Sequence, residues 1–186
     1  MIPKIIHQVW IGKRIPDDLK VFMNTVRETN PDWEYRLWDN DSLAYLLQYI
    51  GSKFKRLDRL SDVLRVKLLA EYGGIYVDCD CIALKPFDDL RKYDFFAYYQ
   101  QVGKKKRRWI ENAFMGSLPS GNTIKRLSAS LDKAEQDTDT IRITREVIAK
   151  CRDRRNRVLP YYYCVARRVF DKSYILHLFA NTWKEA

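Results

Sequence analysis

Two aspartates, Asp78 and Asp80, follow a short apolar run and are separated by one cysteine. Residues two apart in an extended segment project to the same side, so both carboxylates are expected to face one place. Paired carboxylates suit Mn²⁺ or Mg²⁺, which also bind substrate phosphate oxygens, and such a metal would stabilise a departing diphosphate. A solvated turn is the competing interpretation. Two unpaired acids behind a buried strand would be costly without a cation or donor, which favours the metal.

A second polar pair, Asp62 and Arg65, precedes the aspartates by about four helical turns. Residues three apart on a helix share a face, so the two side chains can act at one place. One interpretation is an exposed ion pair of little energetic consequence. The other gives Asp62 to sugar hydroxyls and Arg65 to sugar or phosphate oxygens. The spacing alone leaves both interpretations open.

The elements that must position these residues are clearest in the middle of the chain. Ser61 is expected to cap a helix, which Gly73-Gly74 ends. An apolar stripe with helical spacing lies between them: Leu64, Leu68 and Tyr72. Residues 75–77 then form a short buried strand, so Asp78 lies at the carboxyl end of that strand.

The rest of the chain alternates expected strands with expected helices. Strands are predicted at residues 5–10, 33–38, 95–99 and 112–116. Helices are predicted at residues 17–28, 123–136 and 144–152, and up to Tyr49 after a cap at Asp41 or Ser42. Such alternation indicates an α/β domain with a mainly parallel sheet. Ligands bind such sheets beyond the carboxyl ends of the strands, where Trp10 and Asp78 fall.

Composition sets the limits of the interpretation. The chain has 186 residues, of which 46% are hydrophobic, and this suits a single domain over residues 1–186. No apolar run reaches about 18 residues, and the N-terminus lacks the pattern of a signal peptide. A soluble, cytoplasmic protein is expected. The four cysteines do not form a CxxC pair and are expected to be free, with Cys79 and Cys81 facing the core.

The formal net charge is +10, and the densest basic run spans residues 104–108. The run lacks regularly interleaved aromatic residues and matches no nucleic-acid-binding motif, so no nucleic acid partner is expected. A solvated loop is its commonest explanation. Peripheral contact with an anionic substrate or surface would use the same charge.

Residues 61–80 resemble the core motif of glycosyltransferase family 32, whose hallmark is a sugar-binding region with a DXD motif. Three further segments resemble that family in the same order along the chain, namely residues 2–12, 112–117 and 177–183. In the last segment, Thr182 stands where the family usually has serine, which keeps a hydroxyl. The resemblance therefore extends over nearly the whole chain.

The resemblance implies a GT-A fold, a nucleotide-sugar donor, a divalent cation (Mn²⁺ or Mg²⁺) and retention of anomeric configuration. It assigns metal binding to Asp78, Asp80 and His177, and a catalytic role to Asp78, Asp80 and Arg65. It assigns donor binding to Val9, Trp10, Ile11, Asp62, Arg65, Tyr76, Asp78, Asn112, Thr182 and Trp183.

Several of these residues have structural alternatives. Trp10 would stack on the nucleobase, or it is a core tryptophan of the first strand. His177 lies in an apolar run and is either packed in the core or a metal or diphosphate contact. His7, in the first strand, is expected to be a satisfied core histidine. Asn112 is a donor or acceptor contact, or a polar residue at a strand edge.

The function that follows is transfer of a hexose from a nucleotide-sugar to a glycan, lipid-linked or protein hydroxyl. UDP-sugars are favoured over GDP-mannose as donors. Two other classes remain open: a nucleotide-sugar hydrolase or nucleotidyltransferase, and a non-catalytic module that binds polyanions through its basic surface. A transferase places the sugar on an acceptor, whereas a hydrolase releases it into water. Metal-dependent binding of the donor distinguishes the enzyme from a polyanion-binding module.

Overall fold

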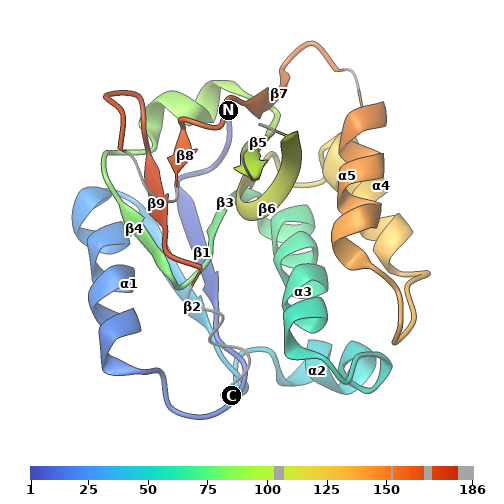
Figure 1. The fold of residues 1–186 in the computed structure, drawn as a ribbon. Coiled ribbons are helices and arrows are strands. Elements are labelled where there is room, and N and C mark those ends of the chain that lie inside the picture. The colour runs from blue at the N-terminus through green and yellow to red at the C-terminus, as the bar shows by residue number, and fades with distance from the viewer. Residues whose placement is uncertain (103–106, 152, 166–168, 180–186) are drawn as a thin grey trace.

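A computed structural model describes residues 1–102, 107–151, 153–165 and 169–179, and it has three layers (Figure 1). The middle layer is a six-stranded sheet in the order β2-β1-β3-β6-β5-β7. Its strands are β1 (Ile5–Val9), β2 (Glu34–Trp38), β3 (Gly74–Val77), β5 (Phe95–Val102), β6 (Arg107–Ser117) and β7 (Asn156–Leu159). Only β6 runs against its neighbours, so the sheet is mainly parallel, as predicted.

The two faces of this sheet are covered differently. One face carries the helices α2 (Ala44–Ile50), α3 (Leu57–Tyr72), α4 (Asn122–Leu131) and α5 (Thr140–Lys150). The other carries α1 (Asp17–Thr29) and a small sheet of β4 (Cys81–Ala83), β9 (Ile175–His177) and β8 (Cys164–Val165). Short 3₁₀ helices occupy Gly51–Lys53 and Asp88–Lys92. Figure 1 shows α1 and α3 on opposite sides of the central strands.

Alternation along the strands explains this arrangement. Tyr76 packs on the α3 side, whereas Ile75 and Val77 pack on the side of α1 and the small sheet. All four residues of β3 are buried, as expected for a strand covered on both faces. Because β1, β2 and β3 are parallel, their carboxyl ends meet at one edge. The reversed β6 runs on past that edge, and the Asp78 amide donates to the Ala113 carbonyl at 2.9 Å.

Two predicted helix caps are wrong. Helix α3 begins at Leu57, four residues before the expected cap, because Leu60 extends the buried apolar stripe by one turn. Ser61 therefore lies inside the helix, where its hydroxyl accepts a hydrogen bond from Arg65 at 3.0 Å. Helix α2 begins at Ala44 without a side-chain cap, since the Ser42 hydroxyl bonds to Asp39 instead.

The α3–β3 junction depends on its two glycines, as expected. Gly73 has φ 66° and Gly74 has φ 92°, both in the region that side chains disfavour. A Cβ on Gly73 would lie 2.5 Å from Pro119 Cδ and 2.7 Å from Pro119 N. We expect Gly73→Ala to lower the free energy of unfolding by about 3 kcal/mol, from the positive φ and the clash together. Urea denaturation measures this change.

Gly51→Ala is the matched control for this substitution. Gly51 has φ −60°, and the nearest atom to an added Cβ is Leu47 Cβ at 3.9 Å. Its replacement should change the free energy of unfolding by less than about 1 kcal/mol. Equal effects at Gly51 and Gly73 would show that the junction is not strained.

His7 is a satisfied core histidine, as predicted, and is fully buried. The Trp38 indole donates to its Nδ1 at 2.9 Å, so the proton lies on Nε2, which donates to the Gly73 carbonyl at 2.8 Å. Burial lowers the pKa of His7 to about 4, and the nearby Arg36 acts in the same direction. The folded protein therefore holds His7 neutral down to a more acidic pH than the unfolded chain does.

This difference predicts a pH-dependent stability. Between pH 6.5 and about 4 the unfolded chain protonates His7 and the folded protein does not, so stability falls as the pH falls. His7 should contribute a loss of about 2 kcal/mol in the free energy of unfolding between pH 7.5 and pH 5. Urea titrations of wild type and His7→Gln at both pH values isolate this contribution by difference. A variant with the same pH dependence as wild type would contradict the prediction.

Candidate active site

A cavity of about 280 Å³ opens at the carboxyl ends of β1 and β3. Its wall contains every described residue that the sequence singled out for donor, metal or catalytic roles. These are Val9, Trp10, Ile11, Asp62, Arg65, Tyr76, Asp78, Asp80, Asn112 and His177. Thr182 and Trp183 lie outside the described residues. The sequence prediction thus converges on one place in the fold.

The acidic segment is a turn and not the extended strand end that was expected. The Cys81 amide donates to the Asp78 carbonyl at 3.2 Å, which closes a four-residue turn after β3. The carboxylates nevertheless converge, because both face His177. Asp80 Oδ1 lies 3.3 Å from His177 Nε2, and Asp78 Oδ2 lies 4.0 Å from it. Cys79 and Cys81 are buried and free, as predicted.

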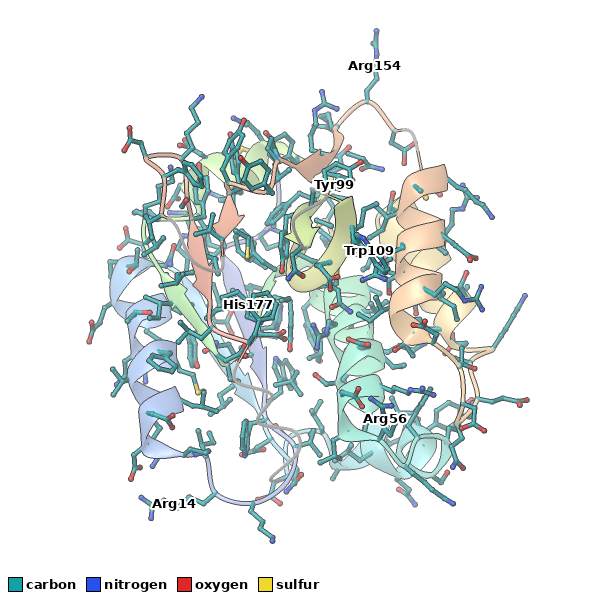
Figure 2. The ribbon with its side chains drawn as sticks, viewed as in Figure 1. Arg14, Arg56, Tyr99, Trp109, Arg154 and His177 are labelled. Carbon is teal, nitrogen blue, oxygen red and sulfur yellow. The ribbon has the colours of Figure 1, made fainter. Side chains whose placement is uncertain are left out.

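The small sheet positions His177. Its strand β9 pairs with β4 so that His177 stands opposite Cys81, directly after the acidic turn. The Tyr98 hydroxyl lies 3.5 Å from His177 Nδ1, on the far side of the ring from the aspartates. Figure 2 shows His177 at the end of β9 that faces α3. The ligand interpretation of His177 therefore has the geometry it needs.

A divalent cation fits this group of side chains. Among the described residues, ligand atoms of Asp80, Cys81 and His177 lie within 4.8 Å of one another, and Asp78 adjoins them. Carboxylate oxygens and an imidazole nitrogen are donors that Mn²⁺ accepts, whereas Mg²⁺ prefers oxygen alone. Burial raises the pKa of the Cys81 thiol, which keeps it protonated and makes it the poorest of the donors.

Arg65, on α3, forms an ion pair with Asp78 of the acidic turn. Its Nη1 lies 3.1 Å from Asp78 Oδ1, the oxygen that also accepts from the Tyr76 hydroxyl at 2.8 Å. The guanidinium lies over the Tyr76 ring, 4.5 Å from its centre, and bonds to the Ser61 carbonyl and hydroxyl. These contacts fix one oxygen of Asp78 and leave Oδ2 directed towards His177.

Asp62 and Asn112 complete this buried network. Asp62 lies 3.4 Å from Arg65 Nη2, and their side chains are 9% and 6% exposed, which excludes the exposed ion pair. Asp62 also accepts hydrogen bonds from Asn112 at 2.7 Å and from Thr140 at 2.6 Å. Asn112 in turn accepts from Arg65 through its side-chain oxygen. The polar groups are thus paired, as buried charges must be.

Burial and charge act against each other in this network. Burial raises the pKa of Asp62, while the charge of Arg65 and the donors Thr140 and Asn112 act in the opposite direction. Burial alone would lower the pKa of Arg65, but Asp78, Tyr76 and Asp62 raise it overall. Arg65 is therefore a permanent cation beside the acidic turn.

Trp10 stands at the rim, half-buried against α1. Its backbone amide donates to the Trp38 carbonyl at 2.8 Å, which continues the pairing of β1 with β2. Its indole N–H donates to the Lys13 carbonyl at 2.6 Å. The indole N–H is therefore engaged by the loop, and only the ring faces can meet a ligand.

The cavity also contains residues that were not predicted: Leu57, Asp58, Ser61, Cys79, Glu111, Ala113, Ile141 and Phe179. Among these unpredicted residues, Glu111 is a charged residue that directly precedes Asn112 on β6. Burial raises the pKa of Glu111, and its ion pair with Arg145 opposes that shift. The position of Glu111 beside Asn112 was a usable signal, whereas Ile141 comes from α5, which carried no motif.

Two solved glycosyltransferases have a similar fold. One is a glycosyltransferase involved in glycosylation of the major capsid of PBCV-1, with TM-score 0.59 and 9% identity over 97% of this chain and 95% of that one. Another is the PaToxG glycosyltransferase, with TM-score 0.53 and 16% identity over 80% of this chain and 69% of that one. The chain has the GT-A fold, as the sequence predicted.

The sequence matches a family model over part of its length. Residues 16–97 match the glycosyltransferase sugar-binding region containing the DXD motif. This match overlaps the resemblance seen in residues 61–80 and agrees with it. Inositol phosphoceramide mannosyltransferase 2 of Schizosaccharomyces pombe is 29% identical, over 72% of this chain and 39% of that protein. Mannosyl phosphorylinositol ceramide synthase SUR1 of Saccharomyces cerevisiae is 30% identical, over 64% of this chain and 32% of that protein.

A viral relative has a similar extent of match. Uncharacterized glycosyltransferase L373 of Acanthamoeba polyphaga mimivirus is 29% identical, over 64% of this chain and 51% of that protein. The chain thus spans about half the length of these curated relatives or less. None of the helices in the described part of the chain combines the length and apolar character of a membrane span.

Proposed function

We propose that the chain transfers a hexosyl group from a nucleotide-sugar to an acceptor hydroxyl, with retention of anomeric configuration. The observation that carries the proposal is the convergence of Asp78, Asp80 and His177 in one cavity, with Arg65 behind them. Carboxylates and an imidazole meeting there suit a cation that binds a diphosphate. The match of residues 16–97 to the glycosyltransferase sugar-binding region supports a sugar as the transferred group.

Asp78, Asp80 and His177 would hold Mn²⁺ or Mg²⁺. When bound, the cation neutralises the donor diphosphate and stabilises it as a leaving group. Arg65 positions Asp78 through their 3.1 Å contact and adds fixed positive charge near the place where the leaving group's negative charge develops. Thr182 and Trp183, outside the described residues, would close over the phosphates.

The remaining wall would bind the nucleoside and the sugar. Trp10 would offer a ring face to the base, flanked by Val9 and Ile11. Asn112 and Asp62 would contact sugar hydroxyls. Because Asp62 already accepts from Asn112 and Thr140, its larger contribution is to orient Asn112.

Retention needs either a carboxylate nucleophile or attack from the face of the leaving group. We favour attack from the same face, with an oxygen of the donor phosphate accepting the acceptor proton. Two further acids line the wall, and each forms an ion pair: Glu111 with Arg145, and Asp58 with Arg56. A product of inverted configuration, read by NMR of the new glycosidic bond, would exclude this mechanism.

Two relatives, inositol phosphoceramide mannosyltransferase 2 and mannosyl phosphorylinositol ceramide synthase SUR1, favour a mannosyl donor and an acceptor built on inositol phosphoceramide. We propose that the donor is a nucleotide-activated hexose, and both GDP-mannose and UDP-hexoses should be tested as donors. The basic surface suits an anionic acceptor or the surface that presents it. Glycan and protein hydroxyls remain alternatives within the same reaction class.

The test follows the sugar and the nucleotide separately. The full chain is incubated with Mn²⁺ and with GDP-mannose or a UDP-hexose, with and without inositol phosphoceramide or a mannoside as acceptor. Acceptor-dependent release of nucleotide, with the sugar found on the acceptor, supports a transferase. Release that is independent of acceptor, with free sugar as product, would make the chain a nucleotide-sugar hydrolase.

A further inference from the structure

Trp109 is an exposed aromatic residue close to the site, and nothing in the proposed function uses it. It lies on β6 and is 41% exposed. The Arg145 guanidinium covers its ring at 4.4 Å from the centre. Figure 2 shows Trp109 between β6 and α5. A large apolar ring held in a fixed orientation at a rim is available to a ligand.

Glu111 links Trp109 to the cavity. The two residues are two apart on β6, so their side chains project from the same face about 6.6 Å apart along the strand. Glu111 lines the cavity, and its Oε1 pairs with Arg145 Nη2 at 2.5 Å. Among the described residues, Glu111 Oε2 accepts no hydrogen bond, so this oxygen can accept one from a ligand.

Arg145 holds the two side chains in place. It comes from α5, one helical turn after Ile141, which lines the same cavity. Its Nε donates to the Ile110 carbonyl at 3.0 Å, while its Nη2 donates to Glu111 Oε1. The guanidinium therefore has a rigid position against Trp109 and Glu111. These three side chains form a surface that continues from the cavity to solvent.

We propose that Trp109, Glu111 and Arg145 form an acceptor subsite for a ring that carries several hydroxyls. The apolar face of such a ring packs on an exposed indole, and its hydroxyls donate to a carboxylate and accept from a guanidinium. A pyranose and a cyclitol share this chemistry. As an acceptor subsite the proposal rests on the proposed function, but binding of a ring to these residues can be tested without a donor.

The test observes Trp109 directly. Trp109 is assigned by its missing signal in Trp109→Phe after labelling the full chain with 5-fluorotryptophan, and ¹⁹F spectra are recorded during titration. The probes are methyl α-mannopyranoside, myo-inositol and glycerol, the last as an acyclic polyol. We expect saturable shifts of the Trp109 signal with one or both rings and none with glycerol. The ring that binds more tightly identifies the source of the acceptor.

Matched variants separate the subsite from the rest of the surface. Glu111→Gln should weaken ring binding about tenfold, because a hydrogen bond to a charged acceptor is lost. Glu146→Gln is the control, since Glu146 pairs with the exposed Arg142 on the same helix. An unmoved Trp109 signal with both rings, or equal shifts with glycerol, would overturn the proposal.

The test is independent of the donor site. Binding of GDP, UDP and their sugars with Mn²⁺ is measured by calorimetry on wild type, Trp109→Ala and Tyr45→Ala, which replaces a tyrosine that is 80% exposed on α2. Donor affinity should be the same in all three proteins. Failure of ring binding with intact donor binding removes only the subsite, and failure of donor binding removes the proposed function.

Discussion

Replacing Asp80 with asparagine should abolish the Mn²⁺-dependent part of nucleotide binding and leave the fold intact. The carboxylate of Asp80 lies 3.3 Å from His177 Nε2, and Asp80 lines the cavity. Asparagine has the same shape but lacks the charge that a hard cation requires. We expect an affinity loss of at least about 100-fold in the presence of Mn²⁺. Calorimetry with GDP and UDP, with and without Mn²⁺, measures it.

The control makes the same change from aspartate to asparagine at a position outside the cavity. Asp132→Asn removes a carboxylate that pairs with Lys67 on the surface of the helical layer, with a side chain 48% exposed. This variant should bind nucleotide as wild type does. Unchanged Mn²⁺-dependent binding in Asp80→Asn would contradict the metal site and leave the cavity without its expected chemistry.

The sequence predicted those site residues whose positions follow from their spacing along the chain. Asp78 and Asp80 follow β3 directly, and the parallel sheet places their turn at the same edge as Trp10. Asp62 and Arg65 are one helical turn apart, and α3 leads straight into β3 through Gly73-Gly74. Short-range spacing and the geometry of an α/β sheet are sufficient for these positions.

The remainder depends on contacts between distant segments. The small sheet of β4, β9 and β8 brings His177 beside Asp80, and only the family resemblance pointed to His177. Strands of two or three residues are too short to show a hydrophobic period, so that sheet was not predicted. Glu111 enters the cavity because reversed β6 runs past the end of β3. Such crossings are invisible in residue spacing.

The observed start of α3 at Leu57, in place of the predicted cap at Ser61, changes the surroundings of Asp62 and Arg65. A cap at Ser61 would have left Asp62 and Arg65 in the frayed first turn of a helix, where exposed pairs are common. The helix begins one turn earlier, so both residues lie in its buried interior, and Ser61 becomes a partner of Arg65. The correction therefore changes the expected energetic importance of Arg65 from small to large.

Arg65→Met should be the most destabilising of the substitutions considered for the site. The methionine fills much of the volume, but Asp62 and Asp78 lose the cation between them, 3.4 Å and 3.1 Å away. Removing one partner of a buried ion pair typically costs about 3–5 kcal/mol, because an uncompensated charge remains. Urea denaturation at neutral pH measures the free energy of unfolding. Arg65→Lys keeps the charge but lacks the forked geometry, so an intermediate loss is expected.

Arg142→Met is the matched control for this prediction. Arg142 pairs with Glu146 on α5, and both side chains are more than half exposed. Its loss should cost less than about 0.5 kcal/mol. If Arg65→Met proved as stable as Arg142→Met, the buried charges would have to be compensated without Arg65. Asp78 would then depend only on Tyr76 for its orientation. A large loss for Arg65 alone would show that the network orienting Asp78 also stabilises the core beneath it.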